Sequence, residues 1–499
     1  MCEVNLLQSS SLIGDAVAGW PLSREHSVKL CVGLVCAGSG VAAQLLGGVG
    51  GSCFHASYPL PSPFNDLQHH ATTNANGSSH FHATTSLTQP LHLHSFSSSR
   101  DYPWAASPVP ASPSRDPRSA AQSLISPHLS EGENQTDTLP LTTPPLRQEF
   151  ACFSYDENHE FHLGDRSMKW YYTPRLGADL SKGFDSFQKH DDSRDEHLDS
   201  LLKTIVAHEQ ETGQKIDANV VTWRGMVTKI LATPFEQNDG FEMNATLYQG
   251  CIFIEESHEH KMAMRRQEAQ RPPRRGGPPQ EVMQFWGYKF ETLSTLPATW
   301  DETSRDYIES REDHVVNNKE QYCSVVRTGI GKAVLCLGGE VDAIWDSKPQ
   351  EPGAPINWVE LKTSAEIRNP GDLDNFHRKL MKYWIQSFLL GVPKIIVGFR
   401  TRDGVLVDIN EIETHRIPDT VKARPNPRWD GNMCVNFAAA FLDWLMRTIN
   451  DEGVWRIRRR PHSPTIEVFR VEETGHGDIL TDEFKNWRIK LALGPSPGD

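Results

Sequence analysis

Two short segments of the chain place charged residues at alternate positions of an otherwise apolar run. The first, Gly-Glu-Val-Asp-Ala-Ile-Trp, contains Glu340 and Asp342. The second, Trp-Val-Glu-Leu-Lys, contains Glu360 and Lys362. Side chains of a β-strand alternate between its two faces, so residues i and i+2 point the same way. The pattern therefore predicts two buried strands, each presenting a pair of charged side chains on one face.

Other hydrophobic patterns predict the elements around these strands. Apolar residues at three- and four-residue spacing predict helices at residues 195–206, 380–389 and 437–449, the second of them ended by Gly391. Apolar runs predict strands at residues 220–231, 245–255, 285–291 and 392–399, and a hairpin of 454–460 with 466–471. We therefore expect a mixed α/β fold in which helices flank central, twisted, mixed β-sheets.

A change of composition near residue 147 divides the chain. Before it, charged residues are sparse and Ser, Thr, Pro, Gly and His are frequent, a composition that cannot bury enough apolar surface to fold. We predict a disordered low-complexity extension over residues 1–147 and a single catalytic domain over 148–499. Residues 30–49 are uncharged and long enough to span a bilayer, but their five glycines disfavour insertion, so we expect no membrane span.

The net charge and the cysteine spacing argue against some classes of protein. The net charge of −14 argues against a general nucleic-acid binder held by bulk electrostatics, so any RNA contact must be a local groove. Basic tracts at residues 265–279 and 456–460 are interpreted as a solvated loop and a solvated face, or as surfaces that meet phosphates. The nine cysteines show no paired spacing, which predicts free thiols in a reducing compartment and no zinc site.

Carboxylates on buried strands require a neutralising partner. Burying three of them beside one ammonium costs several kcal/mol unless a cation compensates. Hard oxygen ligands favour Mg²⁺ or Mn²⁺ over zinc. An acidic residue, a gap such as the 17 residues after Asp342, and then Glu-x-Lys is the pattern of PD-(D/E)xK nucleases. The competing interpretation of these two segments alone is a pair of solvated edge strands with surface charges.

Further motifs in the same order carry a more specific resemblance. They are Thr222-Trp223-Arg224-Gly225, Gly287-Tyr288-Lys289-Phe290-Glu291, Glu340-Val341-Asp342, Glu360-Leu361-Lys362 and Gln386. Over residues 148–499 the chain resembles the DXO-like decapping nuclease family, which includes the fungal binding partner of the nuclear 5′–3′ exoribonuclease. The resemblance implies a PD-(D/E)xK-nuclease-like core.

The resemblance also implies roles for individual residues. Metal ligands would be Glu291, Glu340, Asp342, Glu360 and the carbonyl of Leu361, and four carboxylates suit two Mg²⁺ or Mn²⁺ ions. Lys362 and Gln386 would position the attacking water and the scissile phosphate, and Arg224 would support a phosphate. By its position alone, Gln386 would be a solvent-exposed helix residue.

The function that the resemblance implies is hydrolysis of RNA 5′ ends in the nucleus. It includes removal of incompletely methylated caps and NAD caps, release of pyrophosphate from 5′-triphosphate RNA, and a complex with the nuclear exoribonuclease. Two alternatives stay open: a DNA-directed nuclease with the same metal architecture, and a non-catalytic partner that only stabilises the exoribonuclease. An intact acidic cluster argues against the second, because a scaffold has no need for buried carboxylates.

Overall fold

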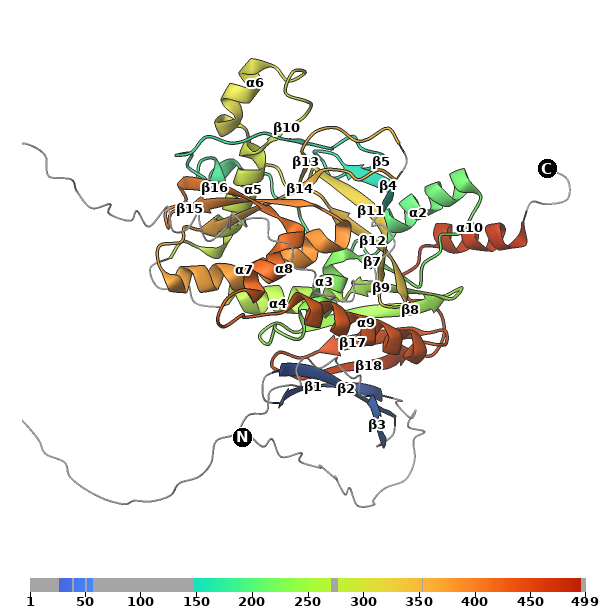
Figure 1. Ribbon diagram of the computed structural model, residues 1–499. Helices are drawn as coiled ribbons and strands as arrows, with labels where there is room; N and C mark the ends of the chain where they lie inside the picture. Colours follow the sequence, from blue (N-terminus) through green and yellow to red (C-terminus); the bar gives the residue numbers. More distant parts are fainter. Residues whose placement is uncertain are drawn as a thin grey trace, which may run out of the picture. The chain divides into compact units, whose positions relative to one another are not determined.

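The computed structural model describes residues 148–270, 277–351 and 353–494, and the backbone of three strands between residues 27 and 56. Two mixed sheets form its frame (Figure 1). The larger sheet contains, in spatial order, β3 (Ser52–Ala56), β2 (Gly40–Val49), β1 (Ser27–Ala37), β18 (Thr465–Glu472), β17 (Val454–Arg459), β8 (Phe241–Tyr248), β9 (Cys251–Glu256), β7 (Val220–Trp223), β12 (Ala333–Glu340), β11 (Gln321–Ile330), β4 (Gln148–Tyr155) and β5 (Phe161–Leu163). The smaller sheet contains β10 (Thr295–Leu296), β6 (Trp170–Tyr171), β13 (Ala343–Ile344), β14 (Trp358–Ala365), β15 (Lys394–Arg400) and β16 (Leu406–Glu413).

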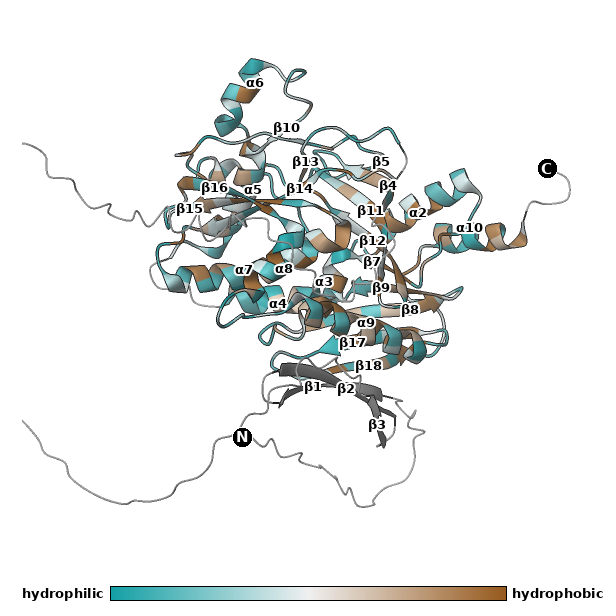
Figure 2. Cartoon of the chain, in the orientation of Figure 1, coloured by the Kyte–Doolittle hydropathy of each residue, from teal (hydrophilic) through white to brown (hydrophobic). Residues whose placement is uncertain are grey.

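Helices pack between the sheets and on their outer faces, as the predicted mixed α/β fold requires. A shared core joins strands of both sheets to α3 (Arg224–Ala232), α7 (Pro370–Leu390) and α9 (Gly431–Thr448). A second core packs α2 (Asp199–Thr212) and α10 (Asp482–Leu493) on the larger sheet, and a third packs α5 (Gln280–Leu293) on the smaller one. Figure 2 shows α9 and α10 with alternating apolar and polar segments, as expected for helices with one buried face.

Shorter helices complete the described elements. They are α4 (His258–Ala269), α6 (Arg305–Ser310), α8 (Ile417–Lys422), η1 (Phe184–Ser186), η2 (Arg311–Asp313) and η3 (Thr414–Arg416).

The predicted helix that carries Gln386 is confirmed as α7. Asn369 caps its N-terminus by accepting a hydrogen bond from the backbone N–H of Asp372 at 3.0 Å, and Pro370 occupies the first turn. Such a cap is worth about 1 kcal/mol. Gly391 ends the helix with a left-handed φ of 75°, which glycine adopts without steric cost. The predictions of α2, α9, β15 and the β17–β18 hairpin are also confirmed.

Two predicted strands are wrong because helical periodicity prevails. Residues 285–291 belong to α5, whose buried side chains Phe285, Trp286, Phe290 and Leu293 recur at helical spacing. In residues 220–231 the strand ends at Trp223 and α3 begins at Arg224. Both changes matter to function, since they put Glu291 on a helix and the arginine at a helix N-terminus.

Three further predictions need smaller corrections. Residues 245–255 form parts of two strands, β8 and β9, because the intervening Gln249 and Gly250 both adopt positive φ and turn the chain. The tract at 265–279 is helical up to Ala269, and its residues 271–276 lie outside the described part. Strand β12 ends at Glu340, so Asp342 follows the strand instead of sharing it.

The predicted disordered extension is only partly described. Strands β1, β2 and β3 form an antiparallel meander, and β1 pairs with β18, with Ser27 opposite Phe469. Apart from Lys29 this stretch has no Lys, Arg, Asp or Glu, and its many apolar residues account for strand formation there. Residues 1–26 and 57–147 lie outside the described residues, so the boundary at 147 stays a prediction. No described helix is long and apolar enough to cross a bilayer.

The cysteines of the described domain form no disulfides, and most arginines of the second basic tract form ion pairs within the fold. Its cysteines are free, and Cys251, Cys323, Cys336 and Cys434 are buried. The arginines of residues 456–460 pair with carboxylates: Arg456 with Glu242, and Arg458 and Arg460 with Glu467. This basic tract is therefore largely neutralised within the fold.

Candidate active site

The acidic residues meet where the chain passes from one sheet to the other. Strand β12 of the larger sheet ends at Glu340, and after two intervening residues β13 (Ala343–Ile344) begins in the smaller sheet. Strand β13 pairs antiparallel with β14, which brings Asp342 beside the start of the Glu-x-Lys segment. The backbone N–H of Leu361 donates a hydrogen bond to Asp342 Oδ2 at 2.6 Å. The two predicted charged pairs thus lie side by side where the chain passes from β12 to β13, a place that we call the seam between the sheets.

Glu360 is the innermost carboxylate of this cluster. Its side chain is only 1% exposed, and two cations hold it: Lys362 Nζ lies 2.6 Å from Oε1 and Arg224 Nη1 lies 3.3 Å from Oε2. Burial acts to raise the pKa of Glu360, but these two cations outweigh it and the pKa is lowered. The same carboxylate, together with Asp342, outweighs the opposite effect of burial on Lys362 and raises the pKa of the ammonium. Both groups are therefore charged at neutral pH.

The other three carboxylates are not neutralised in this way. Burial, followed by the charges of Asp342 and Glu340, raises the pKa of Glu291 well above its ordinary value. Burial also raises the pKa of Glu340, against the opposing charges of Arg224 and Lys362. Burial and the charge of Glu360 raise the pKa of Asp342 to about 7. Four carboxylates thus share two close cations, which leaves a deficit of positive charge.

This deficit fits a divalent cation site. Glu291, Glu340 and Asp342 line one small pocket of about 40 Å³, so they face a common space large enough for an ion. The acidic residues of this pocket offer carboxylate oxygens, the ligand type that Mg²⁺ and Mn²⁺ prefer. Positive charge placed there would hold the three acids ionised at neutral pH. The residues present therefore fit the metal that the sequence predicts.

Gln386 and Arg224 stand in different relations to the cluster. Gln386 is half-buried on α7, three residues after Tyr383, whose hydroxyl donates to the Thr363 carbonyl of β14 at 3.1 Å. This helix face is thus directed at the strand that carries Glu360, although no hydrogen bond joins Gln386 to the carboxylates among the described residues. Arg224 already pairs with Glu360, so its guanidinium supports a carboxylate of the cluster.

Several pocket residues were not identified from the sequence. Lys169, Tyr288, Asn317, Asn318 and Glu320 line the same pocket as the acids. Lys169 forms an ion pair with Glu320 at 3.0 Å and is brought here because β6, immediately after it, pairs with β13. No local pattern around Lys169 signals this position. Tyr288, in contrast, lies within the Gly-Tyr-x-Phe-Glu motif, three residues before Glu291, and helical spacing would have placed it on the same face.

The acidic pocket continues into a larger one. The larger pocket has a volume of about 380 Å³. The two share Ser167, Lys169, Thr292, Thr295, Asn317 and Glu320. The larger pocket adds Arg166, Tyr307 and His314, which offer two cationic or hydrogen-bonding groups and an aromatic ring. The larger pocket therefore lies directly beside the one that contains the carboxylates.

Comparisons with known proteins agree with this geometry. Residues 147–485 match the sequence model of the family described as RAI1 like PD-(D/E)XK nuclease. The chain is 77% identical over 350 residues to a Gibberella zeae protein named Decapping nuclease RAI1, covering 70% of this chain and 93% of the relative.

Solved structures show the same relationship. The structure of Candida albicans Rai1 in complex with pU5-Mn²⁺ aligns with a TM-score of 0.65 at 34% identity, over 71% of this chain and 100% of that one. Scheffersomyces stipitis Rai1 in complex with (3′-NADP)⁺ and a calcium ion aligns with a TM-score of 0.64 at 31% identity and the same coverage. The matched sequence model alone spans more than half of the chain. The chain therefore belongs to the RAI1-like PD-(D/E)XK nuclease family and is a hydrolase of that family.

Proposed function

We propose that this protein is a divalent-metal-dependent decapping nuclease that hydrolyses RNA 5′ ends. The observation that carries the proposal is the under-neutralised cluster of Glu291, Glu340, Asp342 and Glu360 beside Lys362. Relatives named decapping nucleases support it, and so does the relative that binds pU5 and Mn²⁺. Its substrates would be unmethylated caps, NAD caps and 5′-triphosphates.

Each side chain would have a separate task. The four carboxylates and the Leu361 carbonyl would hold two Mg²⁺ or Mn²⁺ ions, and these ions supply Lewis-acid stabilisation of the phosphoryl, attacking and leaving oxygens when bound. Lys362 remains an ammonium because Glu360 and Asp342 outweigh the effect of burial and raise its pKa, so it can donate to the scissile phosphate. Gln386 would orient the attacking water or the 5′ phosphate from α7. Arg224 would keep Glu360 ionised and in place.

The reaction on a 5′-triphosphate conserves atoms and charge. The water oxygen forms a bond to the α-phosphorus, and the bond from that phosphorus to the oxygen bridging to the β-phosphorus breaks. Pyrophosphate leaves, the RNA retains a 5′-monophosphate, and of the two protons of the water one passes to the pyrophosphate and one to solvent. A 5′-monophosphate end is a suitable substrate for a 5′–3′ exoribonuclease. We therefore also propose that the protein acts in the nucleus in complex with such an enzyme.

One comparison of substrates tests the chemistry. Purified protein is incubated with Mg²⁺ or Mn²⁺ and RNAs of one sequence that carry a triphosphate, an unmethylated cap, a methylated cap or an NAD cap, and mass spectrometry identifies the products. We expect cleavage of all but the fully methylated cap, with 5′-monophosphate RNA as a product. A matched DNA oligonucleotide cleaved equally well would favour the DNA-directed alternative. No cleavage of any substrate would favour the non-catalytic alternative.

The proposed complex has its own measurement. Size-exclusion chromatography of the protein mixed with a purified nuclear 5′–3′ exoribonuclease should show co-elution, and the half-life of the exoribonuclease at elevated temperature should increase. Separate elution with an unchanged half-life would contradict the complex without affecting the decapping proposal.

A further inference from the structure

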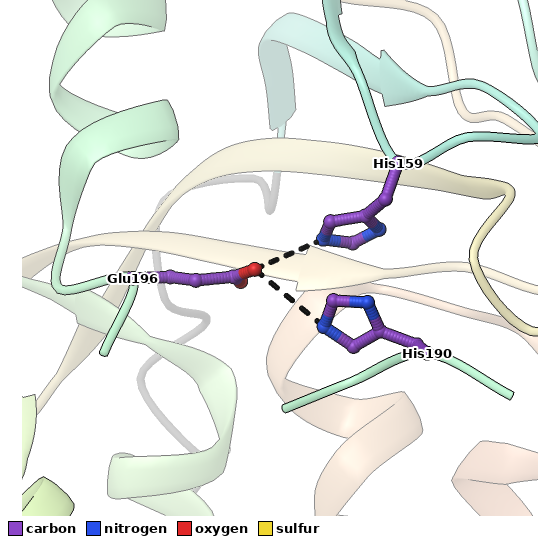
Figure 3. A group of neighbouring side chains, drawn as sticks. All are labelled: His159, His190 and Glu196. Atoms are coloured by element: carbon purple, nitrogen blue, oxygen red, sulfur yellow. Dashed lines mark ion pairs between the residues drawn. The ribbon is translucent and has the colours of Figure 1, made fainter. Parts of the chain in front are cut away.

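Two imidazoles and a carboxylate converge outside the acidic cluster. His159 lies in the turn between β4 and β5, His190 follows η1, and Glu196 precedes α2. Figure 3 shows the Glu196 carboxylate directed between the two rings. His159 Nε2 lies 3.2 Å and His190 Nε2 lies 3.5 Å from the same oxygen, Glu196 Oε1. Two stretches of the chain, one with His159 and one with His190 and Glu196, thus direct three potential ligand atoms at a common point.

The distances match the edges of a metal tetrahedron. With Zn–N and Zn–O bonds of about 2.0–2.1 Å, neighbouring ligand atoms of a tetrahedral site are roughly 3.3–3.4 Å apart. The two measured edges lie on either side of that value, and all three ligand atoms lie within 4.8 Å of one another. A small movement of the His190 ring would therefore complete three corners. The Glu196 side chain is 48% exposed, which leaves the fourth corner open to water.

His159 is oriented as a metal ligand. Its Nδ1 lies 2.8 Å from the carbonyl oxygen of Lys319, an arrangement in which Nδ1–H donates and Nε2 keeps its lone pair. The ring stacks on Tyr155 with centroids 3.9 Å apart, which restricts its rotation. The Nε2 atom is buried and finds no partner with hydrogen-bond geometry among the described residues, although the Glu196 carboxylate is close enough for an ion pair. A buried imidazole nitrogen is thus directed at the carboxylate without being satisfied.

The electrostatics of the group favour one cation between the rings. Burial acts to lower the pKa of His159, but the Glu196 carboxylate and the Lys319 carbonyl outweigh it and the pKa is raised. Burial and the neighbouring His159 lower the pKa of His190, which keeps that ring neutral.

We propose that His159, His190 and Glu196 form a binding site for a Zn²⁺-type transition-metal ion, separate from the acidic cluster. Two imidazole nitrogens and one oxygen are ligands for zinc-like ions, whereas the all-oxygen cluster selects Mg²⁺ or Mn²⁺. The site would fasten the β4–β5 turn and the segment before α2 to the wall of the acidic pocket. That wall contains Asn318, whose side-chain oxygen accepts the backbone N–H of His190 at 2.7 Å.

A neighbouring histidine supplies a matched control. His162 lies on β5, but its Nε2 is 2.9 Å from Asp156 Oδ2 and 3.2 Å from Arg166 Nη1. His162 also forms, with Asp156 and Glu160, a second group whose potential ligand atoms lie within 4.8 Å of one another. Because its Nε2 atom already has Asp156 and Arg166 as partners, we expect the metal to bind at His159 and His190 instead, and the His162 variant tests that choice. His162→Ala removes an imidazole from the same region while leaving the proposed ligands intact.

Cobalt substitution tests the site directly. The full chain is titrated with Co²⁺ in excess Mg²⁺, which occupies the acidic cluster, and visible absorption is recorded because tetrahedral nitrogen-containing sites absorb far more strongly than octahedral oxygen sites. We expect one equivalent of Co²⁺ to produce the intense band and Zn²⁺ to remove it. His159→Ala and His190→Ala should abolish the band, Glu196→Gln should weaken Zn²⁺ binding at least about tenfold, and His162→Ala should retain it.

Two outcomes would overturn the proposal. One is the absence of an intense band in the unaltered chain, and the other is a band that survives in both histidine variants. Circular dichroism in Mg²⁺ establishes whether each variant is folded. Should either fail to fold, the ring-nitrogen NMR shifts of the unaltered chain decide: Zn²⁺ must move the Nε2 signals of two histidines, and unchanged signals would refute the site.

Discussion

Two buried glutamates of this protein differ in how their negative charge is compensated. Glu209 on α2 is fully buried, and Arg488 on α10 contacts both of its oxygens at 2.7 Å. The backbone N–H of Ile216 and the indole N–H of Trp487 donate to the same carboxylate at 2.9 and 3.0 Å. Glu360 is almost as buried and also has two cationic contacts, but it shares them with three further acids.

The difference separates a structural ion pair from a functional one. Around Glu209 every oxygen has two donors, so the charge is compensated within the protein and nothing more can bind. Around Glu360, burial and the surrounding carboxylates raise the pKa of Glu291 and Glu340, and an added cation would let these acids stay ionised. Changes to the first site should affect folding, and changes to the second should affect catalysis.

We call the group of Glu291, Glu340, Asp342 and Glu360 the open cluster, because its charge is not fully compensated. The largest effect should follow removal of two acids from this cluster. Glu340→Ala combined with Asp342→Ala removes ligands from a site whose metal contributes several kcal/mol to transition-state stabilisation, equivalent to about 10³-fold or more in rate. Turnover of a 5′-triphosphate RNA should fall by that factor. The melting temperature without metal should hold or rise, because repulsion between carboxylates decreases. Full activity in this variant would refute the metal-site assignment.

Breaking the buried ion pair of Glu209 and Arg488, the closed pair, should lower stability and leave turnover unchanged. Arg488→Met leaves Glu209 buried without its cation, which costs roughly 3–5 kcal/mol of unfolding free energy. Urea denaturation measures this loss, and turnover of the molecules that remain folded should be unchanged. Arg447→Met is the matched control, because Arg447 is 70% exposed and pairs with Asp443 on the surface, so little stability should be lost. Equal effects of the two variants would contradict the comparison.

Metal and lysine contribute separately to the open site. A chelator should abolish activity, Mg²⁺ or Mn²⁺ should restore it, and Ca²⁺ should inhibit, because its looser coordination misplaces the attacking water. Lys362→Ala should lower turnover by about 100-fold while metal affinity changes less, since the ammonium is a hydrogen-bond donor and no ligand. Titration of each metal against turnover distinguishes the two effects. Activity in chelator, or with Zn²⁺ alone, would exclude this chemistry.

The open cluster should also give the metal-free protein an unusual pH dependence. Burial and the charge of Glu360 raise the pKa of Asp342 from its ordinary 3.8 to about 7. Between these values the folded state holds a proton that the unfolded state has lost, so stability should fall as pH rises through this window. Melting temperatures measured from pH 4 to 8 should decline without metal, and the decline should be smaller in Asp342→Asn, where Glu291 and Glu340 keep a raised pKa. A rise in melting temperature over the same range in the unaltered chain would show that the pKa of Asp342 is not raised in the folded protein.

The smallest effect is expected from the N-terminal extension. Deletion of residues 1–147 should leave turnover unchanged, because none of the proposed site residues lies there. The melting temperature should change little if β1 contributes only an edge to the sheet at β18. A large decrease on truncation would instead show that this pairing supports the domain, and would move the boundary at 147.

Sequence patterns predicted the open site better than the closed one, for a physical reason. Glu340, Asp342, Glu360 and Lys362 lie in short alternating runs, and the segment of each pair could be recognised without knowledge of the other. Glu291 was found through its motif but assigned to a strand, because an aromatic run has high strand propensity while α5 is stabilised by its packing. Glu209 and Arg488 lie 279 residues apart and no local pattern connects them. Lys169 was not identified from the sequence for the same reason, since only the pairing of β6 with β13 brings it to the pocket.

The passage from β12 to β13 at the seam has a consequence for synthesis of the protein on the ribosome. The cluster draws one acid from α5, two from the seam and one from β14, and β14 is held by β15, which follows α7 in the chain. A nascent chain that ends before β15 therefore cannot hold the four acids together. Because such non-local contacts form late, an incomplete chain has no assembled metal site. Hydrolytic capacity should accordingly appear only after most of the domain has been translated and folded.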